Sequence, residues 1–414
     1  MSPTPIRLSL ARTVVVFFCF ALAYFLSALI RAITATLSPN FVSELGVQAA
    51  DLGLLAGGYF LGFSLTQLPL GRWLDRHGPS RVIIAFLSVA VVGCLAFAAA
   101  DSFAGLLLAR VLCGVGLSAC LMAPLTGYRR WFDPGFQLRA NAWMLMTGSL
   151  GMLASTLPVQ WLLPIWGWRP MFVALGVLVA LAMLLIALLV PRWERLPATA
   201  AQADDDGSYR AIWRNPYFWH LTPLGFFTYG GMVAIQTLWA GPWLTQVAGW
   251  SPASAAGGLF LINLAMLGAF WLWGLLTPGL ARRGWSANRL MVVGQPLAFV
   301  LLGVLVLVGP GLGAASALVL ALYCVANTFT SLAQPAVGMA YPSHLAGRAL
   351  SAFNLVIFAG IFVVQWGIGL AVDLGRRMGM ETAQAYQFAM GIYALVALLS
   401  WLHFVQSTRH NRDS

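Results

Sequence analysis

Long apolar runs separated by short polar breaks dominate the chain. A helix needs about 20 apolar residues to cross the hydrocarbon core of a bilayer. Because backbone groups in hydrocarbon must be satisfied within their own segment, each run predicts a membrane-spanning helix. The runs are solidly apolar rather than alternating, which excludes a transmembrane β-barrel. Twelve runs qualify: 13–37, 52–71, 81–100, 103–127, 140–164, 168–190, 217–240, 254–278, 288–309, 313–340, 349–372 and 385–407.

The first run resembles a signal peptide in one respect, because Arg7 and Arg12 precede it. It lacks a small-residue cleavage site and is longer than the apolar core of a signal peptide. We therefore expect it to be retained as the first helix.

One long polar stretch divides the runs into six and six. It covers 191–216 and includes three successive Asp residues at 204–206, a composition typical of a solvated linker. We expect an N-terminal six-helix bundle over 1–190, the linker, and a C-terminal bundle over 217–414.

The two halves repeat one another. Pro39 recurs as Pro242 and Gly46 as Gly249, while LDRHG at 74–78 recurs as LARRG after about half the chain length. A duplicated bundle is a known architecture for alternating access, with the binding site at the midplane between the two copies.

Composition and charge narrow the class further. The chain is 60% hydrophobic and 8% charged, against about 25% charged in soluble domains, which excludes a soluble enzyme and a disordered protein. All 23 basic residues are Arg, and with the N-terminus inside, eighteen fall in inner segments and three in outer loops. This bias predicts a multi-pass protein of the cytoplasmic (inner) membrane with both termini in the cytoplasm, rather than a nucleic-acid-binding protein.

The five Cys all lie inside apolar runs and lack the spacing of metal ligands. We interpret them as packing residues and expect no metal, no cofactor and no enzymatic activity.

The loop GRWLDRHGPSR resembles the signature of the major facilitator superfamily between its second and third helices, with Gly71, Asp75, Arg76 and Gly78 in place. LLLARVLCGVG is similar to the superfamily's helix-4 motif and contains Arg110 and Gly114. The resemblance implies an all-α membrane protein of twelve transmembrane helices, arranged as two pseudo-symmetric six-helix bundles.

The same resemblance implies a conformational latch. In the superfamily the acid of the loop caps the start of helix 11, which here would lie near 348–350. A carboxylate at a helix N-terminus stabilises it by about 0.3–1 kcal/mol. Asp75 would therefore join the halves only while the inner side is closed.

The first run carries a polar face. Tyr24, Ser27, Arg31, Thr34 and Ser38 follow one another at spacings of three and four residues, which places them on one side of a helix. A guanidinium can grip a carboxylate or phosphate with paired N–H donors. The alternative is that the side chain of this Arg extends to the outer headgroups.

Arg31 followed by Pro39 resembles helix 1 of the organophosphate and organic-anion symporters, where that Arg holds an anion in the cavity. The sequence departs from many anion–proton symporters because Ile30 stands in place of an acid and the fourth run has no Glu.

Other runs carry polar residues at helical spacing. They predict hydrogen-bonding walls of a binding cavity, and the alternative is contact between helices. For Arg110 the two alternatives are a role in the cavity and pairing with backbone carbonyls. These candidate substrate-binding residues are Tyr229, Gln236, Tyr323, Asn327, Thr330, Gln334 and Asn354.

We expect a secondary active transporter that takes up a small organic anion by alternating access and works as a monomer in the lipid bilayer. Proton symport is implied only by the resemblance, because all twelve acids lie outside the interiors of the runs. A proton could travel with the substrate, or Glu44 or Asp373 could carry it. The alternatives are an exporter or antiporter of neutral compounds and a non-transporting membrane sensor.

The charge asymmetry gives a prediction about topology. A reporter that is active only in the periplasm should be inactive when fused at Ser208 and active when fused at Glu44. A periplasmic signal at Ser208 would contradict the predicted orientation.

Overall fold

The computed structural model describes residues 8–191 and 208–413, and within these ranges the chain is helical and contains no strand. Part of the predicted linker, 192–207, lies outside the described residues. The rest of it is not extended, because 208–214 form a short helix, α10, which packs on the bundle through a hydrogen bond from the Tyr341 hydroxyl to the Ile212 carbonyl (3.1 Å).

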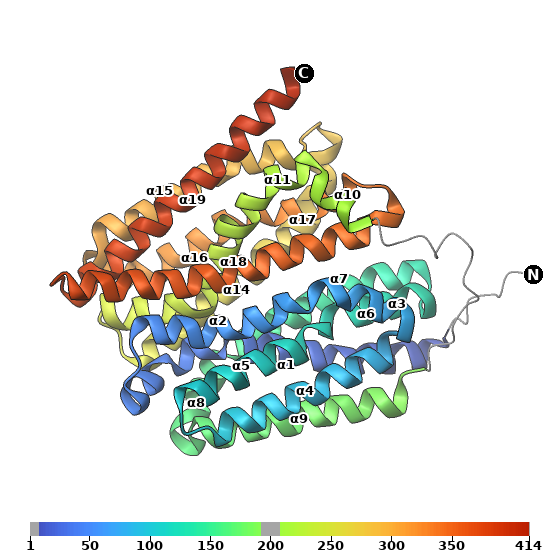
Figure 1. Ribbon diagram of the computed structural model, residues 1–414, viewed down its shortest axis with the longest axis horizontal. Coiled ribbons are helices and arrows are strands. Elements are labelled where there is room, and N and C mark those ends of the chain that lie inside the picture. The colour runs from blue at the N-terminus through green and yellow to red at the C-terminus, as the bar shows by residue number, and fades with distance from the viewer. Residues whose placement is uncertain (1–7, 192–207, 414) are drawn as a thin grey trace, which may run out of the picture.

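The N-terminal half (blue to green in Figure 1) consists of nine helical elements in the described part of the chain. They are α1 (Leu10–Leu45), α2 (Ala49–Leu65), α3 (Gln67–His77), α4 (Pro79–Ala99), α5 (Phe103–Leu117), α6 (Ala119–Trp131), α7 (Pro134–Ala154), α8 (Leu157–Trp166) and α9 (Trp168–Leu189).

The C-terminal half (green to red) follows α10 (Ser208–Arg214). Its elements are α11 (Pro216–Pro223), η3 (Leu224–Tyr229), α12 (Gly230–Ala234), η4 (Ile235–Trp239), α13 (Ala240–Pro242), η5 (Trp243–Val247), α14 (Pro252–Arg282), α15 (Ala287–Val308), η6 (Gly309–Ala315), α16 (Ser316–Asn327), η7 (Thr328–Leu332), α17 (Ala333–Met339), α18 (Ser343–Arg377) and α19 (Thr382–Asp413).

Eight helices of the described chain are long and apolar enough to span a membrane, or up to ten if each of two bent pairs counts as one span. The pairs are α2 with α3, bent by 47°, and α7 with α8, bent by 44°. Pro69 and Pro158 follow the two breaks, and a proline removes a backbone hydrogen bond and so favours a bend.

The runs 288–309 and 313–340 form separate helices that pack on each other, α15 and then α16 to α17, joined by η6 with a non-helical conformation at Gly313. One detail differs from the predicted segments. The run 217–240 is not a regular helix, because π-helical turns at 224–229 and 235–239 interrupt it, and a third turn follows it at 243–247. π-Helical turns are rare in proteins, and those that occur are often found at functional sites.

Glycines allow the closest helix contacts. A Cβ added at Gly114 would overlap the carbonyl oxygen of Tyr59, and one added at Gly62 would overlap that of Val111, so α2 and α5 touch backbone to backbone. Lipid tails are as apolar as the helices, so close packing of small residues stabilises such pairs.

The halves meet along several helices, including α14 against α7 and α8, and glycines mark two of these contacts. Figure 1 shows α2 and α18 side by side where the two halves join, and α18 continues past the end of α2 along α3. Added Cβ atoms at Gly53 and Gly369 would overlap α18 and α2 backbone respectively. In the second contact, a Cβ at Gly241 would lie 2.6 Å from the carbonyl oxygen of Ala35 on α1.

The inner end of the bundle is the end that the Arg distribution predicts to face the cytoplasm, and the outer end is the opposite one. The turn between α3 and α4 lies at the inner end. The turns after α1 and η5 lie at the outer end. All of these contacts at Gly53, Gly369 and Gly241 lie in the outer half of the molecule.

Gly114 should tolerate no side chain. We expect Gly114→Ala to lower stability by about 1–3 kcal/mol, the usual effect of overpacking a tight contact. Thermal unfolding of detergent-solubilised protein measures this. Gly268→Ala is the matched control, because an added Cβ there meets nothing within 4 Å. Equal melting temperatures of the two variants would contradict the packing role.

Candidate functional site

Arg31 lies near the middle of α1 and is half-buried. Its Nη2 donates to the Met152 sulfur on α7 (3.8 Å), and its Nε is buried without a hydrogen-bond partner among the described residues. The guanidinium acts electrostatically on Tyr24, Tyr59 and Tyr229. Tyr229 belongs to η3 of the C-terminal half, so Arg31 lies where the two halves meet rather than at the outer end of its helix.

The rest of the polar face of α1 is mostly buried. The Ser27 hydroxyl lies 3.1 Å from the Tyr59 hydroxyl, and Ser38 donates to the Ala35 carbonyl (2.9 Å). Thr34 is 2% exposed. The Tyr24 ring packs on α7, where a Cβ added at Gly148 would touch it.

Arg110 on α5 is fully buried. Its Nη1 donates to the carbonyl of Ile30 on α1 (2.9 Å), and its guanidinium lies 5.4 Å from the centre of the Tyr59 ring. Its Nε and Nη2 have no hydrogen-bond partner among the described residues. Of the two roles considered for Arg110, the geometry favours pairing with a backbone carbonyl, and it fixes α1 one residue before Arg31.

Tyr59 is the residue that sequence reasoning missed. It lies between the two guanidinium groups and acts electrostatically with both. Within an apolar, Gly-rich run, a single Tyr carries no helical pattern, so only the folded arrangement identifies it.

The polar residues of the C-terminal half behave differently. Gln236 donates to Asn263 on α14 (3.0 Å), Asn327 accepts from Gln295 on α15 (3.0 Å), and the Tyr323 hydroxyl lies 2.9 Å from that of Tyr393 on α19. These three side chains hold neighbouring helices of one half together, which is the alternative considered for them.

The remaining candidates of this half are Thr330, Gln334 and Asn354. Thr330 donates to the carbonyl of Asn327 (2.7 Å) in its own helical stretch. Gln334 on α17 donates to Asn354 on α18. Of the C-terminal candidates, Tyr229 is the one placed beside Arg31.

The loop motif forms the inner end of α3 and the following turn. Gly78 has φ of 78°, a left-handed conformation that favours glycine. Gly71 faces α18, where an added Cβ would lie 3.8 Å from the Ser351 hydroxyl. Arg76 is exposed in the last turn of α3, where a positive charge suits the helix dipole.

Asp75 does not face a helix start as expected. It interacts with Arg348 and Arg129. The prediction that 348–350 begin helix 11 is wrong, because α18 begins at Ser343 and these residues lie inside it. The electrostatic interaction of Asp75 with the C-terminal half is therefore with a guanidinium within α18.

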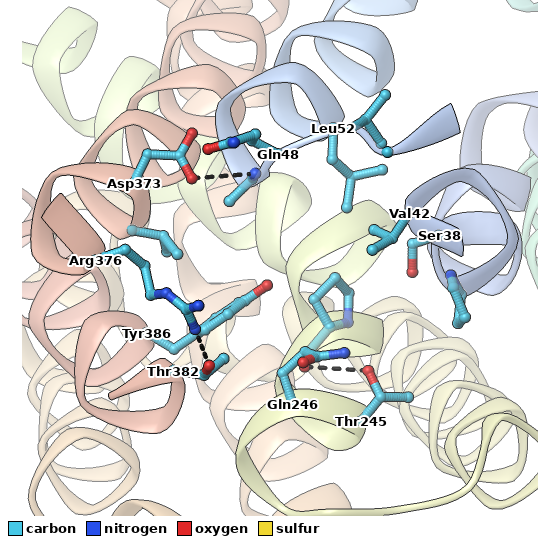
Figure 2. Close-up of a pocket in the computed structure, with 16 residues that line it drawn as sticks. Ser38, Val42, Gln48, Leu52, Thr245, Gln246, Asp373, Arg376, Thr382 and Tyr386 are labelled. Atoms are coloured by element: carbon cyan, nitrogen blue, oxygen red, sulfur yellow. Dashed lines mark hydrogen bonds between the residues drawn. The ribbon is translucent and has the colours of Figure 1, made fainter. Parts of the chain in front are cut away.

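The outer end carries a pocket between the halves. Its volume is about 330 Å³, and both halves line it, with Gln48 and Ser38 from one and Gln246, Asp373 and Arg376 from the other. Figure 2 shows Asp373 accepting a hydrogen bond from the start of α2, the Ala49 N–H, on one side of this pocket. No group of three or more His, Cys, Asp or Glu in the described ranges could hold a metal ion.

Comparison with known proteins gives consistent results. The family model of the Major Facilitator Superfamily matches residues 20–365. Among curated proteins, the 4-hydroxybenzoate transporter PcaK of Acinetobacter baylyi is 27% identical over 43% of this chain and 38% of its own length. A probable L-galactonate transporter of Escherichia coli is 27% identical over 33% of this chain and 30% of its own length.

A multidrug transporter, MdfA of Yersinia pestis, is also 27% identical, over 41% of this chain and 39% of its own length. The chain thus aligns with less than half the length of each of these relatives.

Solved structures share the fold. A bacterial homologue of the lysosomal transporter Spinster, in an inward-facing and unoccupied conformation, gives a TM-score of 0.77 at 18% identity, covering 97% of this chain and 98% of that one. A D-xylose–proton symporter gives 0.75 at 14% identity, covering 95% and 96%. With the family model matched over most of its length and the predicted helical bundle in place, this chain belongs to the Major Facilitator Superfamily of membrane transporters.

Proposed function

We propose that the chain is a secondary active transporter that takes up a small organic anion, of carboxylate or phosphate type, by alternating access. The observation that carries this proposal is Arg31, a guanidinium with an unpartnered N–H at the junction of the halves. Burying a charged group in the middle of a membrane bundle costs free energy, so such a group is typical of a functional site.

The surroundings of Arg31 suit a carboxylate. A guanidinium offers paired donors in a fixed plane, and the hydroxyls of Tyr24 and Tyr229 lie within its electrostatic reach, one from each half. An anion held there would touch both halves, so its binding would differ between the two conformations of the transport cycle, as coupling requires. The names of two relatives, a 4-hydroxybenzoate and an L-galactonate transporter, fit this class of substrate.

Coupling to protons is a further part of the proposal. Glu44 accepts hydrogen bonds from Trp168 (2.6 Å) and Arg169, and these donors favour its charged form. Asp373 accepts two backbone N–H groups. Both acids are engaged by these donors at the outer end, away from Arg31, so we favour a proton that enters together with the anion rather than one carried by either acid.

The second candidate is an exporter of neutral compounds. The similarity to a multidrug transporter favours it. A thermal-shift screen of purified protein against 4-hydroxybenzoate, L-galactonate, inorganic phosphate and uncharged sugars separates the two, because a ligand that binds only the folded state stabilises it. Stabilisation by a neutral compound alone would favour the exporter.

Arg31 gives the sharpest prediction for the site. We expect Arg31→Gln to abolish ligand-induced stabilisation while the ligand-free protein still folds. A lost charged hydrogen bond costs about 1.5–3 kcal/mol, roughly 10- to 150-fold in affinity. Arg31→Lys should lose nearly as much, because an ammonium lacks the paired planar donors.

The control is Arg139→Gln, which removes an equal charge from an exposed position on α7. It should bind normally. Near-normal affinity in Arg31→Gln would remove the main support for an anionic substrate.

Asp75 is proposed as the inner latch. Asp75→Asn removes its attraction to Arg348 and shifts the balance between conformations without breaking the fold. We expect slower transport in membrane vesicles with near-normal expression and melting temperature. Wild-type flux in this variant would contradict the latch.

A further inference from the structure

A carboxylate near the outer end of α18 holds the first turn of α2. The Asp373 Oδ1 accepts the backbone N–H of Ala49 (3.2 Å), and its Oδ2 accepts that of Ala50 (2.9 Å). These residues are more than 300 positions apart in sequence and belong to opposite halves. The contact is therefore a direct bridge across the plane along which a transporter of this fold opens.

The bridge is not needed to make α2 a helix. The first turn of α2 has its own capping box, in which the Asp51 side chain accepts the Gln48 N–H (3.1 Å) and the Gln48 side chain accepts an N–H of the first turn. The Ala49 and Ala50 amides are surplus to this box. Gln48 and Ala49 line the outer pocket, so water can satisfy these amides when Asp373 withdraws.

The bridge also lies at the outer end of the closest contacts between α2 and α18. One turn below it, a Cβ added at Gly369 would overlap the backbone of Ala49, and deeper still one added at Gly53 would overlap that of Gln365. Towards the inner end the contact of α3 with α18 is looser, since a Cβ added at Gly71 would meet only the Ser351 hydroxyl, at 3.8 Å. Opening the outer side must break the bridge and separate these surfaces together.

We propose that Asp373 is an outer interlock, which stabilises the conformation with the outer side closed and exchanges its two amide bonds for water when that side opens. It mirrors Asp75 at the inner end, with the direction reversed. Asp75 reaches from the N-terminal half to α18, and Asp373 reaches from α18 to the N-terminal half. Negative charge favours a helix N-terminus, so Asn in its place holds α2 less firmly.

The test measures how often the outer side opens. Ser38 lines the outer pocket from α1 yet is 2% exposed in this closed form, and Ser38→Cys changes little in size. The rate at which an impermeant thiol reagent modifies this cysteine from outside reports the open fraction. The five native cysteines are buried, and protein without the added cysteine supplies the background.

We expect Asp373→Asn to raise the modification rate about tenfold, the equivalent of one charge-assisted hydrogen bond. Asp51→Asn is the matched control, because it weakens a cap on the same helix without crossing between the halves. It should leave the rate unchanged. Ser43→Cys, exposed at the outer end of α1, should react equally in all three backgrounds.

An unchanged rate in folded Asp373→Asn would overturn the interlock, and so would an equal increase in Asp51→Asn. Asp373→Ser provides a second neutral variant, with the same expectation. If neither variant folds, the bridge is required for the fold itself and the interlock is again overturned. None of these measurements uses a substrate, so their outcome is separate from that of the proposed function.

Discussion

Hydrocarbon offers no hydrogen-bond partner, so every polar group inside this bundle must find one on another helix or at the seam between the halves. Three polar side chains of the C-terminal half meet this constraint within that half. Gln236, Asn327 and Tyr323 each bond a side chain on a neighbouring helix of the same half. Buried polar atoms without a hydrogen-bond partner remain in both described halves, but the charged ones, on Arg31 and Arg110, belong to the N-terminal half.

The position of the two buried guanidinium groups makes the halves unequal in chemistry while they are alike in fold. The C-terminal half supplies the hydroxyl of Tyr229, which interacts with Arg31 of the other half. Its first membrane segment is interrupted by π-helical turns. The N-terminal half supplies the positive charge and the closest helix packing, with Gly114 against Tyr59. Duplication explains the shared fold. The repeat does not extend to the charge, since Ala234 occupies the position equivalent to Arg31 at an offset of 203 residues.

The fold was predictable from sequence because apolar length and hydrocarbon leave so few options. Each predicted run falls on helical structure, and the family signature in GRWLDRHGPSR was confirmed by the family model. Helix ends were less predictable. The start of α18 at Ser343 and the helix at 208–214 depend on tertiary contacts, such as the bond from Tyr341 to Ile212, that no local pattern records.

The site was predictable only in part, for a different reason. A helical pattern shows which residues share a face, and it found the stripe around Arg31. It cannot tell which neighbour that face meets. Tyr323 and Asn327 share a face with good spacing, yet their partners are Tyr393 and Gln295 in the same half. Tyr59 has no pattern at all and emerges only because α2 and α5 touch at Gly114.

The placement of the acids follows from the same constraint. Carboxylates in hydrocarbon would need partners that a mobile seam cannot guarantee, and in the described chain they lie at the ends of the bundle. There, Asp75 interacts with Arg348 of α18, and Asp373 of α18 accepts two N–H groups of α2. In the proposed cycle, charge in the middle binds the substrate and charge at the ends holds the halves together. A bridge at the ends can then form and break without leaving a buried carboxylate unpaired.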